Sequence, residues 1–456
     1  MDRLVIAGTH SGAGKTTVTA GLLAALWKRG LSVQPFKVGP DYIDTGYHAV
    51  AAGRMSYNLD LWMMPAPNLL GLFRHGMDGM DIGIIEGVMG LYDGVGSTPE
   101  GSTAEVAKLL QAPVVLVVDA GGMSASAAAQ VLGYKNFDSG LRLAGVIVNN
   151  VGSQRHYKLI KDAVESYTGI PALGFLPRDK AVALPSRHLG LLPAEEMERH
   201  AEIIDKAAAL VQEWIDLDRV IALGRSAGSL PPAGALTFEK GDPVRIAVAR
   251  DESFSFYYRS TLELLAALGA ELCYFSPMKD GRLPENIDGL YLGGGFPEVF
   301  AGDLASNKSL LDDINRKLKD GLYCYAECGG FMYLTGSITG KNGEKHPMAG
   351  FFDGRTVMTD RLQRFGYVDI EFTGENVLGK EGQQVRGHEF HHSLVEGITY
   401  PPTYLVKSTL SGGRWRCGYR RANTLAAYAH IDFWGYPELA RHFLDHCRGV
   451  SGGRGC

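Results

Sequence analysis

The run Leu4-Val5-Ile6-Ala7-Gly8 leads directly into Thr9-His10-Ser11-Gly12-Ala13-Gly14-Lys15-Thr16-Thr17, and this junction decides the fold of the first half. The apolar run predicts a buried strand, and the residues from Lys15 onward predict a helix. A glycine-rich loop between a strand and a helix N-terminus presents backbone N–H groups to phosphate oxygens. We therefore expect a nucleotide phosphate site built from Gly12, Ala13, Gly14, Lys15, Thr16 and Thr17.

Two side chains of this loop have distinct expected tasks. Lys15 supplies a positive charge for the terminal phosphates, and the Thr16 hydroxyl is an expected Mg²⁺ ligand. Five residues separate Gly8 from Gly14, one more than in the standard phosphate loop. The strand end that would read a guanine base is Val148-Asn149-Asn150-Val151, which lacks an Asn-Lys-x-Asp pattern. ATP is therefore the expected nucleotide rather than GTP.

Short apolar runs alternate with helix-like segments outward from this loop. Such alternation predicts a parallel sheet with helices on both faces. The expected strands lie near residues 3–8, 32–38, 81–86, 113–118, 143–149 and 172–176, and the clearest helices at 15–29 and 123–134.

A second alternating system begins at residue 244, after a helix expected over 194–223 and a Pro/Gly-rich segment at 230–234. Its expected strands lie near 244–249, 271–275, 288–292 and 321–326, its helices near 257–268 and 308–319, and the chain beyond about 345 looks strand-rich. We therefore predict two α/β domains, residues 1–225 and 244–448, joined by a linker at 226–243.

Two acidic loops follow strands of the first domain: Lys37-Val38-Gly39-Pro40-Asp41-Tyr42-Ile43-Asp44 and Glu86-Gly87-Val88-Met89-Gly90-Leu91-Tyr92-Asp93-Gly94. Ligands bind at the carboxyl ends of strands in open α/β sheets. A magnesium nucleotide needs hard oxygen ligands. We therefore expect Glu86, and Asp44 as the next candidate, to join Thr16 around the metal. Asp41, Asp44 and Asp93 could each equally well cap a helix or a turn.

In the second half, Tyr323-Cys324-Tyr325-Ala326-Glu327-Cys328-Gly329-Gly330 predicts a strand, a tight turn and a helix start. Small residues two places either side of Cys328 suit a nucleophile on a strained elbow, and a helix N-terminus favours the reactive thiolate. The glycine run Gly293-Gly294-Gly295 ends another expected strand. We expect Gly294, Gly295 and Gly329 to form an oxyanion hole beside Cys328.

Cys328 needs a base, and His430 is the expected one because it follows the apolar stretch 425–429. Asp432, two places later, is a carboxylate at a position from which it could orient the imidazole.

A competing signal is His388-Glu389-Phe390-His391-His392, which formally matches the zinc-protease pattern H-E-x-x-H. That pattern binds zinc only on a helix, where residues four apart share one face. The preceding residues 384–387 show no helical periodicity. We interpret the match as accidental or as a substrate-side segment.

Composition limits the class of protein. The 456 residues are 45% hydrophobic and 21% charged with a net charge of −5, which suits a folded protein and disfavours nucleic-acid partners. No signal peptide or membrane span is apparent, and six irregularly spaced cysteines suggest reduced thiols. We expect a cytoplasmic protein without a membrane partner; a homodimer is compatible with the sequence.

Taken together, these segments resemble the cobyrinic acid a,c-diamide synthase family over essentially the whole chain. The phosphate loop itself resembles that of dethiobiotin synthetase, and His10 stands where partition-type ATPases carry a signature lysine. The segments that carry the family resemblance are 12–16, 40–44, 86–94, 293–298, 326–330 and 386–391.

The resemblance implies a P-loop NTPase-like domain of the dethiobiotin synthetase type followed by a class I glutamine amidotransferase-like domain. It implies a carbon–nitrogen ligase that uses ATP, Mg²⁺ and glutamine to amidate the a and c carboxylates of a corrinoid through an acyl phosphate. Cys328 and His430 would release ammonia, which an internal channel would carry to the N-terminal domain. The residues implied to line the ATP, metal and substrate site are Asp41, Tyr42, Ile43, Asp44, Glu86 and Asp93.

The same resemblance leaves the tetrapyrrole open, because hydrogenobyrinic acid and nickel-sirohydrochlorin a,c-diamide synthases share these motifs; cobyric acid synthase is a more distant relative. It also leaves the role of Asp432 open, since the triad glutaminases carry Glu at that position. A different class of protein, a P-loop ATP switch that recruits partners, would have no use for the Cys328 elbow.

Overall fold

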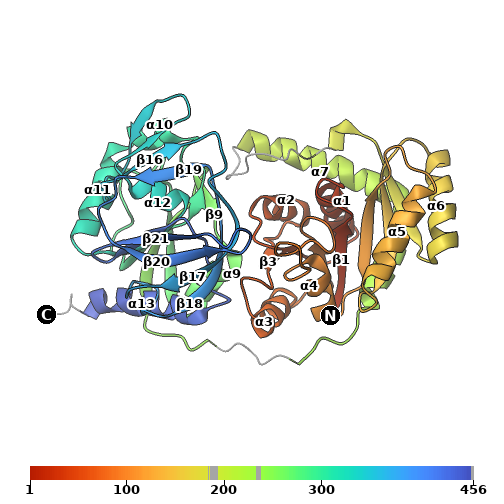
Figure 1. The fold of residues 1–456 in the computed structure, drawn as a ribbon, viewed down its shortest axis with the longest axis horizontal. Coiled ribbons are helices and arrows are strands. Elements are labelled where there is room, and N and C mark those ends of the chain that lie inside the picture. The colour runs from red at the N-terminus through yellow and green to blue at the C-terminus, as the bar shows by residue number, and fades with distance from the viewer. Residues whose placement is uncertain (183, 185–193, 233–237, 453–456) are drawn as a thin grey trace. The chain divides into compact units, whose positions relative to one another are not determined.

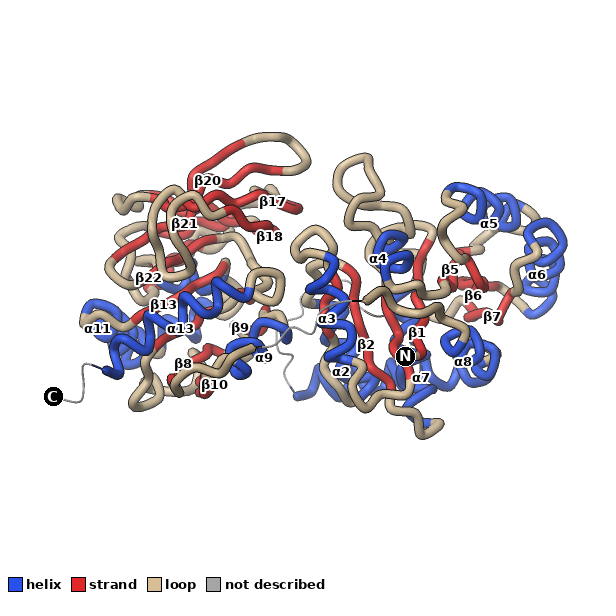
Figure 2. Tube along the Cα trace, turned by 90° about the horizontal axis from the view of Figure 1, so that it is seen from below, coloured by secondary structure: helices blue, strands red, loops and turns tan. Residues whose placement is uncertain are grey.

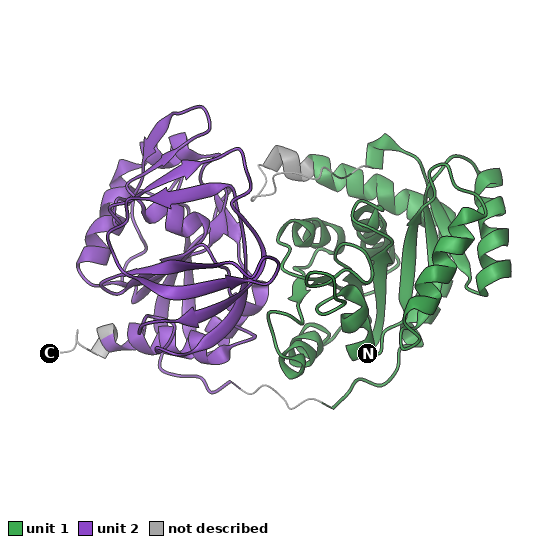
Figure 3. Ribbon diagram, in the orientation of Figure 1, with its two compact units in different colours: residues 1–189, 193–235 green, residues 190–192, 236–456 purple. Residues whose placement is uncertain are grey.

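Buried apolar strands build one main sheet in each of two units. The computed structural model describes residues 1–182, 184, 194–232 and 238–452 (Figure 1). The first unit ends within the described residues at 232 and the second starts at 238 (Figure 3). No helix in these ranges combines the length and the apolar character needed to cross a bilayer.

The first unit contains a seven-stranded sheet in the order β3-β2-β4-β1-β5-β6-β7, with every neighbouring pair parallel. Strands β2 and β4 are buried at every residue because helices cover both faces of the sheet. The strands are β1 (Asp2–Gly8), β2 (Val33–Val38), β3 (Tyr57–Leu59), β4 (Ile82–Glu86), β5 (Val114–Asp119), β6 (Leu143–Val151) and β7 (Ala172–Pro177).

Helices α1, α2 and α7 pack against one another on one side of this sheet, and Figure 2 shows α4 and α5 on the other. This is the arrangement that right-handed crossovers produce. The helices are α1 (Lys15–Lys28), α2 (Ile43–Ala52), α3 (Ala66–Gly76), α4 (Thr103–Leu109), α5 (Ser126–Phe137), α6 (Gln154–Thr168), α7 (Ala194–Trp214) and α8 (Leu217–Arg225), with a 3-10 turn at Lys180–Val182.

The second unit contains a nine-stranded sheet in the order β10-β8-β11-β13-β22-β21-β20-β17-β18. Its first five strands are parallel and the remainder antiparallel. The strands are β8 (Val244–Ala249), β10 (Ala270–Phe275), β11 (Gly289–Leu292), β13 (Tyr323–Glu327), β17 (Arg364–Phe372), β18 (Gln384–His391), β20 (Pro402–Ser408), β21 (Arg414–Arg421) and β22 (Thr424–Ala427).

Two smaller sheets complete this unit, β12-β9 and β15-β14-β16-β19. Their strands are β9 (Phe254–Phe256), β12 (Gly294–Gly295), β14 (Ser337–Thr339), β15 (Lys345–Pro347), β16 (Arg355–Met358) and β19 (Ser393–Glu396). The helices are α9 (Arg259–Ala267), α10 (Ala301–Ser306), α11 (Lys308–Lys319), α12 (Gly329–Leu334) and α13 (Pro437–Gly452).

Every strand expected from the sequence is present, with ends within two residues of the expected ones. The single helix expected over 194–223 is wrong: α7 ends at Trp214 and α8 starts at Leu217. Ile215 forms a bridge with Gly174 there, and the Asp216 side chain accepts a hydrogen bond from the Arg219 amide, which starts a new helix.

Candidate active sites

The phosphate loop occupies the expected position between β1 and α1. Gly14 precedes the helix with φ of 94°, a conformation that glycine adopts without strain. A Cβ atom on Gly14 would also collide with the side-chain amide of Asn149, at the end of β6. That amide donates to the Ala13 carbonyl at 3.0 Å, so a side chain of β6 holds the phosphate loop in place.

Lys15 lies inside this loop and is only 6% exposed. Its Nζ donates to the Met89 carbonyl at 2.5 Å and to the His10 carbonyl at 3.2 Å. Burial, followed by the charge of Lys37, lowers the pKa of Lys15. The ammonium group thus connects the phosphate loop to the loop that follows β4.

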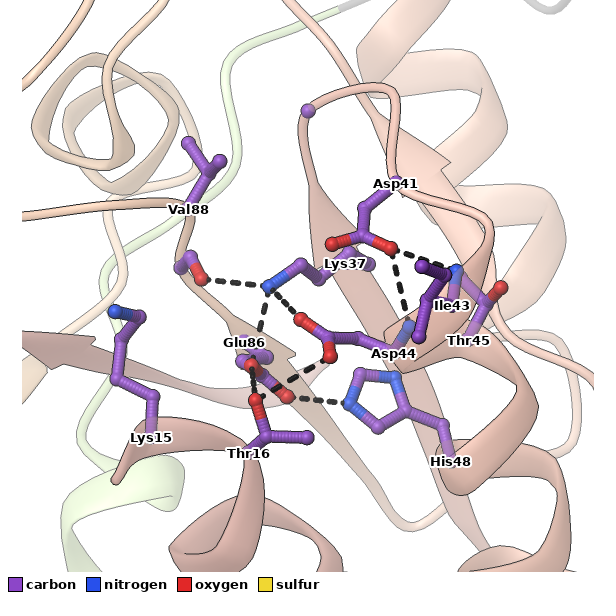
Figure 4. A network of polar contacts seen from close by, with 12 residues as sticks. Lys15, Thr16, Lys37, Asp41, Ile43, Asp44, Thr45, His48, Glu86 and Val88 are labelled. Carbon is purple, nitrogen blue, oxygen red and sulfur yellow. Dashed lines mark hydrogen bonds and ion pairs between the residues drawn. The ribbon is translucent and has the colours of Figure 1, made fainter. Parts of the chain in front are cut away.

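A charged cluster lies next to this loop at the carboxyl ends of β2 and β4 (Figure 4). Lys37 is 2% exposed and its Nζ contacts Asp44 Oδ2 at 2.7 Å, Glu86 Oε1 at 3.0 Å and the Gly87 carbonyl at 2.9 Å. The sequence interpretation assigned no role to Lys37. Its place at the end of a fully buried strand is the sequence signal that could have marked it as functional.

Glu86, fully buried, uses both carboxylate oxygens. Oε1 accepts from the Thr16 hydroxyl at 2.8 Å, and Oε2 lies 2.6 Å from His48 Nε2. His48 is itself fully buried on α2, with Nδ1 3.2 Å from Ser56 Oγ. The sequence interpretation also missed His48, because nothing in a lone helical histidine indicates what it will face.

The protonation of this cluster follows from burial and mutual contact. Burial, opposed by Lys37 and reinforced by Glu86, raises the pKa of Asp44 to about 8. Burial alone would raise the pKa of Glu86, but Lys37 and His48 lower it well below its usual value. Asp44 and Glu86 overcome the effect of burial on Lys37 and raise its pKa. Glu86 and Lys37 are therefore a charged pair at neutral pH.

Thr16, Asp44 and Glu86 converge as the sequence predicted. Thr16 Oγ1 lies 3.4 Å from Asp44 Oδ1, in addition to its contact with Glu86. Hydroxyl and carboxylate oxygens are the donors that Mg²⁺ prefers. The three side chains fit a Mg²⁺ site at the start of α1.

The other expected substrate residues surround the start of α2. The Asp41 carboxylate accepts from the amides of Ile43 and Asp44, at 2.7 and 3.1 Å, and Tyr42 is the N-cap residue. Asp93 accepts from the Gly90 amide at 2.8 Å. Asp41 and Asp93 thus stabilise their own loops, the turn-forming role that the sequence left open.

In the second unit Cys328 stands on the expected elbow between β13 and α12. Its φ of 47° and ψ of −102° are strained values for a residue with a side chain. The Cys328 amide donates to the Ala427 carbonyl of β22 at 2.7 Å. The strained conformation presents the thiol at the start of a helix.

The glycine loop packs directly against this elbow. The Gly330 amide donates to the Gly293 carbonyl at 2.9 Å, and a Cβ atom on Gly329 would lie 3.0 Å from the Gly295 nitrogen. A Cβ atom on Gly294 would lie 2.6 Å from His430 Cε1. Gly294 thus lies against His430, and Gly329 lies against Gly295 beside the elbow; their part in an oxyanion hole stays a prediction.

His430 is 2% exposed and hydrogen-bonds to Cys328. Burial alone would lower the pKa of His430, but the contacts with Cys328 and Glu327 raise it to about 10. His430 Nδ1 lies 3.7 Å from Glu327 Oε2. The structure therefore joins the two residues predicted from the sequence and adds Glu327, which the sequence interpretation missed.

Asp432 has different partners from those suggested by its place two residues after His430. Both of its oxygens lie 2.9 Å from Ser260 Oγ, and Oδ1 accepts from the Trp434 amide at 2.9 Å. The carboxylate thus anchors the first turn of α9.

The H-E-x-x-H match lies mainly on strand β18, where residues four apart do not share a helical face. His388 forms an antiparallel bridge with His430, with amide–carbonyl distances of 3.1 and 2.9 Å in the two directions. Within the described ranges, no group of three His, Cys, Asp or Glu side chains is arranged to hold a metal ion. The segment supports the base of the elbow site instead of forming a zinc site.

Comparison with known proteins matches both halves of the chain. Residues 4–192 match the CobQ/CobB/MinD/ParA nucleotide binding domain, and residues 245–437 match the CobB/CobQ-like glutamine amidotransferase domain. A protein of Caldanaerobacter subterraneus subsp. tengcongensis named cobyrinate a,c-diamide synthase is 46% identical, covering 97% of this chain and 98% of that protein. A Salmonella typhimurium protein of the same name is 44% identical over 98% of both chains.

Solved structures similar to single units include a glutamine amidotransferase with a TM-score of 0.34 and 20% identity, covering 44% of this chain and 98% of that one. The cell division ATPase MinD of Pyrococcus furiosus has a TM-score of 0.29 and 22% identity, covering 45% of this chain and 99% of its own. The full-length relatives and the two family domains carry the conclusion: this chain belongs to the cobyrinate a,c-diamide synthase family.

Proposed function

We propose that this protein amidates the a and c carboxylates of cobyrinic acid, using ATP to activate each carboxylate and glutamine to supply the nitrogen. The observation that supports this most directly is the presence, in one chain, of a phosphate loop beside an acidic cluster and of a Cys328–His430 elbow. The substrate follows from the name shared by the full-length relatives.

The glutaminase reaction uses the second unit. The Cys328 thiolate attacks the carboxamide carbon of glutamine, forming a C–S bond while the amides around Gly294, Gly295 and Gly329 hold the oxyanion. His430 gives its proton to the nitrogen as the C–N bond breaks, and ammonia leaves. Water, deprotonated by His430, then releases glutamate and restores the thiol.

The ligase reaction uses the first unit. An oxygen of the substrate carboxylate attacks the γ-phosphorus of ATP, giving an acyl phosphate and ADP. Ammonia then attacks the carbonyl carbon, phosphate leaves, and an amide forms after loss of a proton. Lys15 and the backbone around Gly12, Ala13, Gly14 and Thr17 bind the phosphates, while Asp41, Tyr42, Ile43 and Asp93 are the proposed substrate contacts.

Mg²⁺ would be held by Thr16, Asp44 and Glu86, and it would neutralise phosphate charge when bound. In this assignment residues 1–225 bind nucleotide and substrate, 226–243 link the domains, and 244–448 form the glutaminase. A cytoplasmic location and a homodimer stay predictions from the sequence.

A nitrogen-source experiment tests the proposal. Cys328→Ala should lose amidation driven by glutamine while amidation driven by ammonium salt continues. Lys15→Ala should lose amidation with both nitrogen sources but still hydrolyse glutamine. Ammonia-driven product from Lys15→Ala would contradict ATP activation at this loop.

The acceptor is tested by comparing turnover of the unaltered protein on cobyrinic acid, hydrogenobyrinic acid and nickel-sirohydrochlorin. We expect the highest kcat/KM with cobyrinic acid. A higher kcat/KM with hydrogenobyrinic acid or nickel-sirohydrochlorin would identify that compound as the substrate and leave the proposed reaction unchanged. Unaltered ATP-linked activity in Cys328→Ala, together with an absence of glutamine hydrolysis by the parent protein, would favour an ATP switch.

A further inference from the structure

Glu327 is a buried carboxylate directly before the nucleophile in sequence. It ends β13, is 1% exposed, and its Oε2 lies 3.7 Å from His430 Nδ1. Three donors hold its position: Tyr325 Oη at 2.7 Å and the Ile431 amide at 3.2 Å on Oε1, and Tyr291 Oη at 3.1 Å on Oε2. The carboxylate is therefore fixed on both sides and aimed at the imidazole.

Aromatic rings separate this carboxylate from water. Tyr291 and Tyr325 stack at 5.5 Å between ring centroids, and Phe433 stacks on Tyr325 at the same distance. Burial first, and then the charge of Glu327, raise the pKa values of Tyr291 and Tyr325 well above their usual range, so both phenols remain donors. A charge interaction between Glu327 and His430 is weakly screened in such surroundings.

Asp432 is the competing carboxylate, since it follows His430 by two residues. In addition to its contacts with Ser260 and the Trp434 amide, it accepts from Thr261 Oγ1 at 3.3 Å. Thr261 Oγ1 in turn accepts from the Phe433 amide at 3.0 Å. These contacts fix the chain after His430 to the start of α9, so Asp432 stabilises the local fold.

We propose that Glu327 is the positioning residue of the glutaminase, orienting His430 and balancing the positive charge that the imidazole carries when Cys328 is a thiolate. The inference rests on the proposed glutaminase function and deepens it. Strand pairing keeps the three groups together: Glu327 pairs with Ala427 between β13 and β22, and the Cys328 amide donates to the Ala427 carbonyl. His430 follows Ala427 by three residues and is held by its bridge to His388.

The pH dependence of Cys328 alkylation tests this role without any substrate. Iodoacetamide reacts with the thiolate, so its rate reports the thiolate–imidazolium pair, and mass spectrometry separates Cys328 from the other cysteines. The charged or titratable groups that face His430 are Cys328, Glu327 and His388. The comparison is between the unaltered protein, Glu327→Gln and the matched control Asp432→Asn.

In Glu327→Gln the loss of the counter-charge should move the pH of half-maximal alkylation upward by roughly one to three units. Glutamine hydrolysis at pH 7 should fall by about ten-fold or more for the same reason. Asp432→Asn should leave the alkylation profile in place even if it lowers the unfolding temperature. An unchanged profile in Glu327→Gln, or an equal shift in Asp432→Asn, would overturn the inference.

Glu327→Asp provides a second variant if Glu327→Gln does not fold. It keeps the charge but withdraws it from His430 by one methylene group, so a smaller upward shift is expected. A profile identical to that of the unaltered protein in folded Glu327→Asp would count against the role.

Ammonia-driven amidation measured in the same preparations tests the ligase separately. If that reaction is absent from the unaltered protein while the alkylation shift is present, the proposed overall function fails but the role of Glu327 stands. If ammonia-driven amidation is present and the alkylation shift is absent, the ligase function stands but the role of Glu327 fails.

Discussion

Lys37 is the residue on which the ligase cluster depends electrostatically. Its ammonium group is 2% exposed and lies between the carboxylates of Asp44 and Glu86, at 2.7 and 3.0 Å. Removing one partner of a buried ion pair leaves the other charge in a medium that solvates it poorly. The cluster should therefore be more sensitive to loss of the cation than any pair on the surface.

Lys37→Met should lower the free energy of unfolding of the first unit by about 3 to 5 kcal/mol at pH 7, because the buried, ionised Glu86 carboxylate loses its cation. Urea unfolding followed by circular dichroism measures this change. Lys161→Met is the matched control, since Lys161 pairs with Glu165 at 3.9 Å on the surface and is 40% exposed. Its loss should change stability by less than about 1 kcal/mol, and equal effects would contradict the account.

The main candidate site residues could be proposed from the sequence because the chemistry assigned to them depends on local sequence. Lys15 and Thr16 belong to one loop, and the small residues around Cys328 indicate an elbow whatever the rest of the chain does. Glu327, Lys37 and His48 could not be assigned in this way. Their roles depend on which side chains the sheets bring opposite them, and for the carboxylate beside His430 the sequence spacing suggested Asp432 instead of Glu327.

At the scale of elements, buried strands were the most predictable part of the chain. Continuous apolar runs such as residues 82–85 of β4 form central strands because both faces of the sheet are covered. Short elements such as β3 (Tyr57–Leu59) and β12 (Gly294–Gly295) were not predicted. Their few residues carry no periodicity, and pairing with β2 and β9 alone makes them strands.

The turn from β13 into α12 leaves no room for a side chain at Gly330. A Cβ atom there would collide with the Leu292 carbonyl, so Gly330→Ala should displace the elbow from the glycine loop. We expect glutamine hydrolysis to fall by about 100-fold, as for a displaced nucleophile. A glutamate-release assay measures this.

Gly449→Ala provides the control for that substitution, because a Cβ atom at Gly449 in α13 has no neighbour within 4 Å. Full activity in Gly330→Ala, or an equal loss in Gly449→Ala, would contradict the packing explanation.

The loop between β12 and α10 carries a carboxyl group that should make stability depend on pH. Burial raises the pKa of Glu298 from 4.5 to about 7. A raised carboxyl pKa means that ionisation disfavours the folded state, so stability should fall as pH rises from about 4.5 to 7. Glu298→Gln should therefore raise the unfolding temperature at pH 8 and leave it unchanged at pH 4. Melting curves at both values test this, and a lower temperature at pH 8 would count against it.

At the scale of the whole molecule, each unit has its own sheet and its own buried core. We expect calorimetry to show two transitions. ATP with Mg²⁺ should shift only the transition of the first unit, by about 2.7 kcal/mol at a hundred times its Kd. Alkylation of Cys328 by an electrophilic glutamine analogue should shift only the unfolding transition of the second unit. A single transition moved equally by both treatments would show that the units unfold together.

The position of Glu327 next to Cys328 has a consequence for the evolution of this glutaminase and for its transfer to another protein by engineering. The two side chains occupy neighbouring codons and share one peptide bond, so no insertion or recombination outside that dipeptide can separate them. Only the imidazole arrives from a distant segment, three residues after the end of β22, the strand that pairs with β13. A graft onto another parallel sheet would thus need two peptides rather than three for the thiol, the imidazole and the carboxylate, in addition to the glycine loop at 293–295.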